Sequence, residues 1–166
     1  MTTEDRSWNT GGVPLLSPGN GLEDALTVTI DSRPECVAQA AVRIAATLQI
    51  WCAPEVAMDM ETCLVEAANN IIEHAYQGEA DHRLTISIYR RKNDRIEILL
   101  IDDGRPIPAE RLASVPVLPE FDTFNLESLP EGGFGMALIW ALADNIQYES
   151  ANGRNVMTLI KRLESF

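Results

Sequence analysis

Residues suited to chemistry are concentrated between positions 66 and 76. Glu66 and Asn70 are one helical turn apart, and Glu73 and His74 follow about one turn later, so a helix would place all four on one side. That side adjoins an apolar stripe, so we expect Glu66 and Asn70 to be partly shielded from water. An amide oxygen is a hard ligand for Mg²⁺, and a carboxylate can accept a proton. A solvated polar face of an amphipathic helix is the alternative.

A second candidate site is Asp102-Asp103-Gly104, which stands where an apolar strand ends. A carboxylate in that place can accept a hydrogen bond from an exocyclic amine such as that of adenine. The glycine allows the chain to turn and a ligand to approach closely. Asp-Gly is also an ordinary turn sequence, so this segment alone does not distinguish a ligand site from a turn.

The third candidate is the glycine-rich segment from Glu131 to Leu138, in which three glycines lead directly into a helical pattern. Free N–H groups at the start of a helix form a cradle for phosphate, although such segments also occur as plain loops. The sequence contains no G-x-x-x-x-G-K-[ST] motif, no dinucleotide-fold glycine pattern and no G-x-S-x-G elbow. A nucleotide bound here would be held mainly by backbone N–H groups, helix dipoles and a metal ion.

The elements that must position these segments follow the order β-α-α-β-β-loop-α-β-β. A helix capped by Ser32 is expected to begin at Pro34, and Asn152-Gly153 is expected to form a hairpin turn. The expected strands are 25–30, 83–91, 95–101, 146–150 and 156–163, and the expected helices are 34–48, 54–76 and 132–143.

These elements predict a two-layer α/β (α+β) sandwich with a mixed, largely antiparallel sheet. The first residues are rich in Gly, Pro, Ser, Thr and Asn, so residues 1–24 are expected to form a flexible N-terminal extension. Residues 25–166 are expected to form a single domain.

The composition excludes several classes of function. A net charge of −12 disfavours binding to nucleic acid or to an anionic membrane. No apolar run approaches the ~20 residues that cross a bilayer, and no signal peptide is evident, so we expect a cytoplasmic protein. The three scattered cysteines and two histidines do not form a zinc motif, so free thiols are expected.

The three candidate segments, in this order and spacing, resemble those of the GHKL ATPases, the superfamily that includes histidine kinases, gyrase and mismatch-repair ATPases. Within that superfamily, the residues of these segments are similar to those of the anti-sigma-factor serine/threonine kinases. The similar segments are Val65-Glu66-Ala67, Asn70, His74-Ala75-Tyr76 and Glu131 to Leu138. The resemblance covers about Leu26 to Leu163 and implies a Bergerat-type ATP-binding fold.

The resemblance implies a role for each polar residue of the helix. Asn70 would coordinate the Mg²⁺ that bridges the phosphates of ATP. Glu66 would act as the catalytic base toward the attacking hydroxyl, or would position that hydroxyl. His74 would line or brace the pocket, with a packing role as the alternative.

The resemblance also implies which residues would bind the adenine end and the phosphate end of the nucleotide. Asp102 would accept a hydrogen bond from the adenine amine, and Gly104 would shape that wall. The lid and phosphate cradle would consist of Gly132, Gly133, Phe134 and Gly135.

Two segments depart from the family pattern. Members commonly carry Gly-Thr near the start of the last strand, where this chain has Arg154-Asn155, and Asn155 could replace the threonine by hydrogen bonding. The Asp-x-Gly segment continues as Arg105-Pro106-Ile107-Pro108 instead of ending in Phe-Asp.

The resemblance implies an anti-sigma factor that uses Mg-ATP to phosphorylate a serine or threonine of an anti-anti-sigma (STAS-domain) partner. It would sequester a sigma factor when that partner is phosphorylated, and it would act as a homodimer. The main alternative is an ATP-binding partner-switch module without significant kinase activity. A histidine-kinase catalytic half and an interaction domain without a nucleotide are further alternatives.

Overall fold

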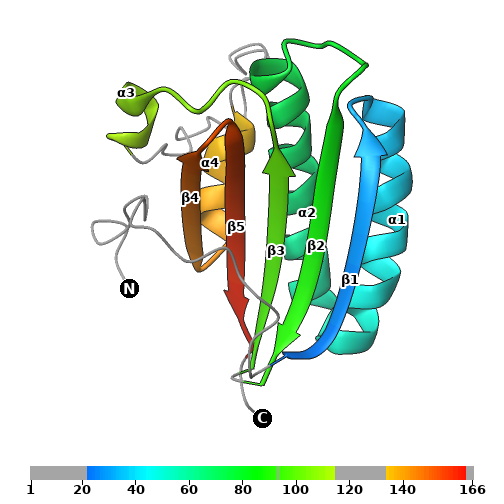
Figure 1. Cartoon of the computed structure of the whole chain (residues 1–166). Coiled ribbons are helices and arrows are strands. Elements are labelled where there is room, and N and C mark those ends of the chain that lie inside the picture. The colour runs from blue at the N-terminus through cyan, green and yellow to red at the C-terminus, as the bar shows by residue number, and fades with distance from the viewer. Residues whose placement is uncertain (1–21, 93, 115–133, 164–166) are drawn as a thin grey trace, which may run out of the picture.

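Five strands form one sheet in the order β1-β2-β3-β5-β4 (Figure 1). The computed structural model describes residues 22–92, 94–114 and 134–163. The strands are β1 (Leu22–Asp31), β2 (Arg83–Arg91), β3 (Arg95–Asp102), β4 (Asn145–Ala151) and β5 (Arg154–Arg162). The helices are α1 (Pro34–Trp51), α2 (Pro54–Asn70), the π-helical turn η2 (Ile71–Ala75), α3 (Ala109–Leu112) and α4 (Phe134–Leu142).

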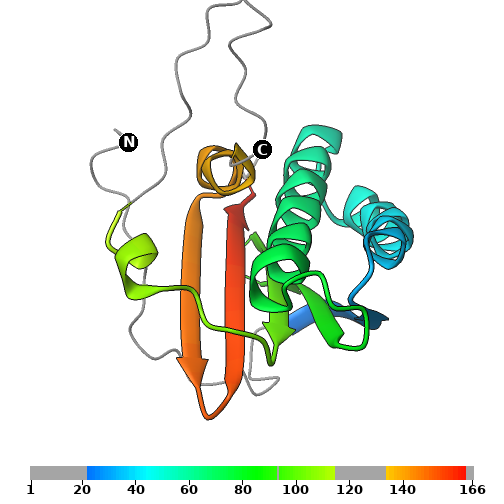
Figure 2. The same ribbon diagram turned by 90° about the horizontal axis from the view of Figure 1, so that it is seen from above.

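Helices α1, α2 and α4 cover one face of the sheet, as the view from above shows (Figure 2). In Figure 1, α1 and α2 lie behind the half that contains β1 and β2, and α4 lies behind β4 and β5. The predicted α+β two-layer sandwich is confirmed. Its sheet, predicted as mixed and largely antiparallel, has no parallel pair in the described part of the chain, since all four strand pairs there are antiparallel.

The core lies between these two layers. Alternate residues of the central strands point toward the helices and are fully buried, as in the series Leu84, Ile86 and Ile88 of β2. The helices meet them with aliphatic side chains spaced one turn apart, such as Ile44 and Leu48 of α1. Burial of each such side chain contributes about 1.5–3 kcal/mol to the stability of the fold. The packed sheet and α2 therefore hold the polar residues that they carry in fixed positions.

The closing hairpin has the predicted turn. Asn152 and Gly153 have φ values of 54° and 74°, which are the left-handed values that a two-residue hairpin turn of this type requires. The strands β4 and β5 on either side are paired from Ala151 and Arg154 to Asn145 and Ile160. The turn therefore sets the register of the last two strands.

Some element boundaries differ from the predictions. The backbone of β1 already pairs with β2 at Leu22, so the strand begins before the expected domain boundary at residue 25. Ser32 does not cap α1, because Arg33 occupies the N-cap position. Ser32 Oγ instead donates to the carbonyl oxygen of Glu79 at 2.5 Å and accepts from the N–H of His82 at 3.2 Å. The serine thus fixes the connection between η2 and β2 to the end of β1.

The second helix also ends differently from the prediction. Its α-helical part stops at Asn70, and a π-helical turn continues to Ala75. The short helix α3 lies in the segment between residues 101 and 132, which was predicted as a loop. No helix in the described ranges has the length and apolar content needed to cross a bilayer.

Candidate functional site

The side chains of Glu66 and Asn70 lie one turn apart on α2 and are half-buried, as expected. Gly135 at the start of α4 lies directly opposite them. A Cβ at Gly135 would collide with Oε2 of Glu66 and would lie 3.5 Å from Nδ2 of Asn70. Two segments about 65 residues apart in the sequence therefore meet here, and a glycine is what allows their close approach.

Helix α4 packs along α2 in the opposite direction. Its first turn faces Glu66 and Asn70, and the carbonyl oxygen of Ile139 faces Cys63, whose Sγ lies 4.0 Å away. Burial raises the pKa of Cys63 to about 12, so this residue remains a thiol that can donate to the carbonyl. This arrangement directs the positive end of the α4 dipole toward the two polar side chains of α2.

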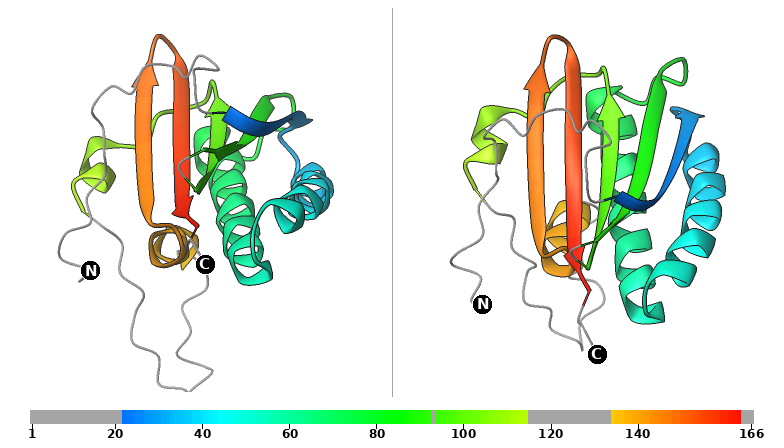
Figure 3. Two further views of the ribbon diagram at one scale, coloured as in Figure 1. Left: turned by 90° about the horizontal axis from the view of Figure 1, so that it is seen from below. Right: turned by 60° about the horizontal axis from the view of Figure 1, so that its bottom comes forward.

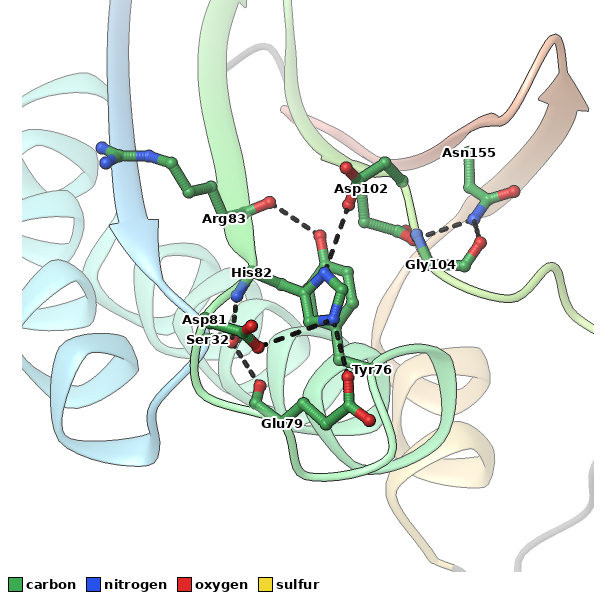
Figure 4. A network of polar contacts seen from close by, with 10 residues as sticks. Ser32, Tyr76, Glu79, Asp81, His82, Arg83, Asp102, Gly104 and Asn155 are labelled. Atoms are coloured by element: carbon green, nitrogen blue, oxygen red, sulfur yellow. Dashed lines mark hydrogen bonds and ion pairs between the residues drawn. The ribbon is translucent and has the colours of Figure 1, made fainter.

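A second polar group surrounds Asp102 at the end of β3. The antiparallel register places Asp102 opposite Asn155 of β5. Oδ1 of Asp102 accepts hydrogen bonds from the N–H of Gly104 at 2.9 Å and from Nδ2 of Asn155 at 2.8 Å (Figure 4). Nδ2 of Asn155 also donates to the carbonyl oxygen of Gly104 at 3.0 Å. Asn155 thus binds both the carboxylate and the loop that follows it.

Asp102 and Asn155 are both buried. Burial raises the pKa of Asp102, and its two hydrogen bonds oppose that effect. Both bonds end on Oδ1, so Oδ2 has no hydrogen-bond partner within the described ranges. That free oxygen is an acceptor suited to an exocyclic amine.

The loop after Asp102 rests on the π-helical turn. A Cβ at Gly104 would lie 2.8 Å from the backbone carbon and oxygen of Ala75, so only glycine fits without moving backbone. The N–H of Arg105 donates to the carbonyl oxygen of Ala75 at 3.0 Å. The continuous helix formed by α2 and η2 therefore carries Glu66 and Asn70 and supports the Asp102 loop at its C-terminal end. Single π-helical turns frequently occur at functional sites.

Beyond this loop, Tyr76 and His82 extend the network, with stacked rings 4.4 Å apart (Figure 4). The hydroxyl of Tyr76 donates to the carbonyl oxygen of Arg83 at 2.6 Å, and burial raises the Tyr76 pKa. His82 Nε2 lies 3.1 Å from Glu79, and its Nδ1 lies 3.8 Å from Asp103. No role for these two aromatic rings was predicted from the sequence, although Tyr76 belongs to the His74-Ala75-Tyr76 segment.

The remaining predicted residues are placed as follows. Glu73 and His74 lie in η2 and are exposed, because the wider winding there changes the phase of the helix after Asn70. An exposed His74 does not fit the alternative packing role. Phe134 is the first residue of α4 and is half-buried. Gly132 and Gly133 lie outside the described residues.

Within the described ranges, one group of side chains lies close enough together to hold a metal ion, and it consists of Glu79, Asp81 and His82. The two carboxylates are exposed, and such groups are common without a metal. This group does not include Asn70, so it neither supports nor contradicts the predicted Mg²⁺ ligand.

Comparisons with known proteins agree with this architecture. The model of the family described as "Histidine kinase-like ATPase domain" matches residues 30–161. A Bacillus mycoides protein named serine-protein kinase RsbW is 35% identical over 99 residues, which cover 60% of each chain. An Oceanobacillus iheyensis protein of the same name is 29% identical over 139 residues, which cover 81% of this chain and 84% of the relative.

A solved structure shows a similar fold. The crystal structure contains the RsbU and RsbW domains of a Mycobacterium tuberculosis protein, and it matches with a TM-score of 0.60 at 15% identity. The match covers 87% of this chain and 34% of that chain. At this level of identity the likeness concerns the fold alone.

Proposed function

The chain belongs to the histidine kinase-like ATPase family, and from this premise we propose that it is an Mg-ATP-dependent protein serine/threonine kinase. One observation carries the proposal. Glu66 and Asn70 face Gly135, and the loop that follows Asp102 rests on the end of the same helix, which supports a single site formed by the three sequence segments. A nucleotide needs this combination of an amine acceptor at one end and polar groups near a helix start at the other.

The base end is proposed to be formed by Asp102 and Asn155. The free Oδ2 of Asp102 would accept a hydrogen bond from the adenine amine, while the carboxamide of Asn155 holds the carboxylate in place. Because Nδ2 of Asn155 already donates to two protein oxygens, this residue performs the supporting role that threonine has in the family pattern.

The phosphate end is proposed to lie between α2 and the start of α4. Asn70 would contribute its amide oxygen to Mg²⁺, and Gly132, Gly133, Phe134 and Gly135 would surround the phosphates. Mg-ATP supplies the γ-phosphoryl group when bound. Glu66 would orient the serine or threonine hydroxyl and accept its proton as the new O–P bond forms and the bond to the departing ADP breaks.

The protein substrate is proposed to be an anti-anti-sigma factor with a STAS domain, and the partner released or sequestered in turn is proposed to be a sigma factor. The name serine-protein kinase on the relatives supports the reaction type. The acidic chain, with its net charge of −12, suits protein partners better than nucleic acid. A homodimer, as in the family that it resembles, is part of the same proposal.

Calorimetry with wild type and Asn70→Ala tests the nucleotide site. Wild type is expected to bind ATP in a Mg²⁺-dependent manner, and the variant is expected to lose that dependence. Absence of ATP binding by wild type would refute the proposal. Transfer of labelled phosphate from ATP to purified STAS-domain proteins of the source organism then tests the kinase. ATP binding without transfer to any of them would indicate a partner-switch module without kinase activity.

A further inference from the structure

Helix α4 is held at its C-terminal end by a group of charges that the proposed reaction does not use. Nζ of Lys161, on β5, donates to the carbonyl oxygen of Leu142, the last residue of α4, at 2.7 Å. The same ammonium lies 3.4 Å from Oδ2 of Asp59 on α2 and 3.8 Å from Oδ1 of Asp144, which follows α4. The lysine side chain is only 19% exposed.

This position joins three elements at one point. A cation at the last carbonyl of a helix is favoured by the negative end of the helix dipole. Asp59 comes from the helix against which α4 packs, so the ammonium also connects the two helices directly. Lys161 therefore opposes movement of α4 along α2 and away from β5.

The opposite end of α4 is the end that faces Glu66 and Asn70. The helix has nine residues, so its ends are only about 13 Å apart, and a displacement of one end would be expected to move the other. A shift at Leu142 is therefore transmitted to Gly135. In the right view of Figure 3, α4 lies behind the lower ends of β4 and β5, on the same face of the sheet as α2.

We propose that Lys161 is a positioning residue for the phosphate end of the nucleotide site, acting through α4 and not by touching the nucleotide. The inference rests on the proposed binding of Mg-ATP. Without the lysine, α4 would spend part of its time displaced from the position in which its first turn faces the phosphates. The apparent dissociation constant for a ligand equals the intrinsic constant divided by the fraction of protein in the competent state, so it rises as that fraction falls.

Within the described ranges, the hydrogen bonds of the Asp102 and Asn155 side chains join them to each other and to Gly104, and none of these bonds involves α4. A change in α4 should therefore alter the affinity for Mg-ATP more than the affinity for adenosine, whereas a general loss of structure would lower both. Adenosine has the base and no phosphates, so its affinity reports on Asp102 and Asn155 alone. Mg-ATP reports on both ends.

The test is calorimetric titration of Mg-ATP and of adenosine into wild type, Lys161→Met, Lys161→Arg and Lys92→Met. Lys92 is the other of the two lysines in the chain and is exposed, so its replacement changes the net charge equally. Lys161→Met is expected to weaken Mg-ATP about five- to tenfold and adenosine less than about twofold. Lys161→Arg is expected to restore most of the affinity, and Lys92→Met is expected to behave as wild type.

Folding of the lysine variant is expected to persist, because other bonds join the chain after α4 to β5. The N–H of Asp144 donates to the carbonyl oxygen of Ile160, and Oδ2 of Asp144 accepts from the N–H of Arg162. If Lys161→Met does not fold, Asp59→Asn removes the helix–helix contact alone and is expected to weaken Mg-ATP about two- to threefold with adenosine unchanged.

Two outcomes would overturn the inference. Equal losses for Mg-ATP and adenosine would make Lys161 a purely structural residue, and unchanged affinities would give it no role in the site. Wild type that binds neither ligand would instead refute the proposed function. If wild type and the Lys161 and Asp59 variants all bind both ligands with equal affinity, only the positioning role is refuted and the proposed function stands.

Discussion

The two ends of the proposed nucleotide site differ in how firmly the protein holds them. At the base end, Asp102 accepts two hydrogen bonds and Asn155 bonds both the carboxylate and the adjacent loop. At the phosphate end, the side chains of Glu66 and Asn70 form no hydrogen bond with other residues in the described ranges, and they are only half-buried.

The difference follows from what each end has to do. A base is distinguished by acceptors and donors at fixed positions, so a rigid network increases selectivity. The phosphate end must take up a metal ion and accept a proton during transfer, and a side chain that is already bonded to protein would have to break those bonds first. We therefore expect substitutions at the base end to change binding or folding, and those at the phosphate end to change the reaction.

The largest effect is expected from Glu66→Gln. The amide cannot accept the hydroxyl proton, so the rate of phosphate transfer to a STAS-domain substrate should fall about 10²- to 10⁴-fold. ATP affinity should remain within about threefold of wild type, because the shape of the side chain is kept. Single-turnover transfer from labelled ATP and calorimetry measure the two quantities. Glu73→Gln is the matched control, since Glu73 is exposed on the next turn. Equal losses of binding and transfer would contradict the division between the two ends.

The next largest effect is expected from Asp102→Asn at the base end. The amide oxygen can still accept from Gly104 and Asn155, but its NH₂ group replaces the free acceptor Oδ2. ATP affinity should fall about ten- to hundredfold, which corresponds to the loss of a hydrogen bond to a charged group. Because burial raises the pKa of Asp102, its ionised form opposes folding above that pKa, so the variant should be no less stable than wild type at neutral pH. Asp103→Asn, next in the chain and exposed, is the control. Unchanged ATP affinity would remove Asp102 from the site.

A comparison of two glycines should give a smaller effect that separates folding from activity. At Gly104 an added Cβ meets the backbone of Ala75, so Gly104→Ala should lower the free energy of unfolding by about 1–3 kcal/mol. At Gly135 the added Cβ meets the end of the Glu66 side chain, which can rotate away, and alanine favours a helix more than glycine. Gly135→Ala should therefore change stability by less than about 1 kcal/mol and reduce phosphate transfer.

Urea denaturation and the transfer assay measure these two effects. Gly153→Ala serves as a reference for the intrinsic cost of losing a glycine, because it stands at positive φ with open space around its Cα. A Gly135→Ala variant that is less stable than Gly104→Ala would show that the phosphate end is the more rigid of the two.

Much of this arrangement could be predicted from the sequence, because the signals were local. Alternating apolar residues defined β2 and β3, and Asn152-Gly153 defined the last hairpin. Glu66 and Asn70 were placed together by helical spacing. Asn155 was proposed as a hydrogen-bonding replacement for threonine, and the structure bonds it to Asp102.

The remaining features depend on contacts between distant residues. Ser32 has the sequence position of a helix cap, but its hydroxyl bonds Glu79 and His82, which are about 50 residues away. The π-helical turn that changes the phase of Glu73 and His74 is bonded to Arg105, and no periodicity within residues 66–76 indicates it. Lys161 belongs to no motif in the sequence, and its partners Asp59, Leu142 and Asp144 come from distant positions in α2 and at the end of α4.

The smallest expected effect concerns His82, which extends the rigid base end toward Asp103. The hydrogen bond with Glu79 is the main cause that raises the His82 pKa, and the nearby Asp81 and Asp103 raise it further. NMR titration should therefore give His82 a pKa above the ordinary value of about 6.5, and Glu79→Gln should lower it.

A folded pKa above the unfolded value adds stability that is fully present below the unfolded pKa and is lost as pH rises through the folded pKa. The stability difference between wild type and His82→Gln, measured in urea at pH 5.5 and 8.5, should thus shrink at the higher pH. His74→Gln is the control, because His74 is the only other histidine and is exposed. A His82 pKa that does not respond to Glu79→Gln would mean that this contact does not form in solution, and the rigid part of the site would then end at Asp102.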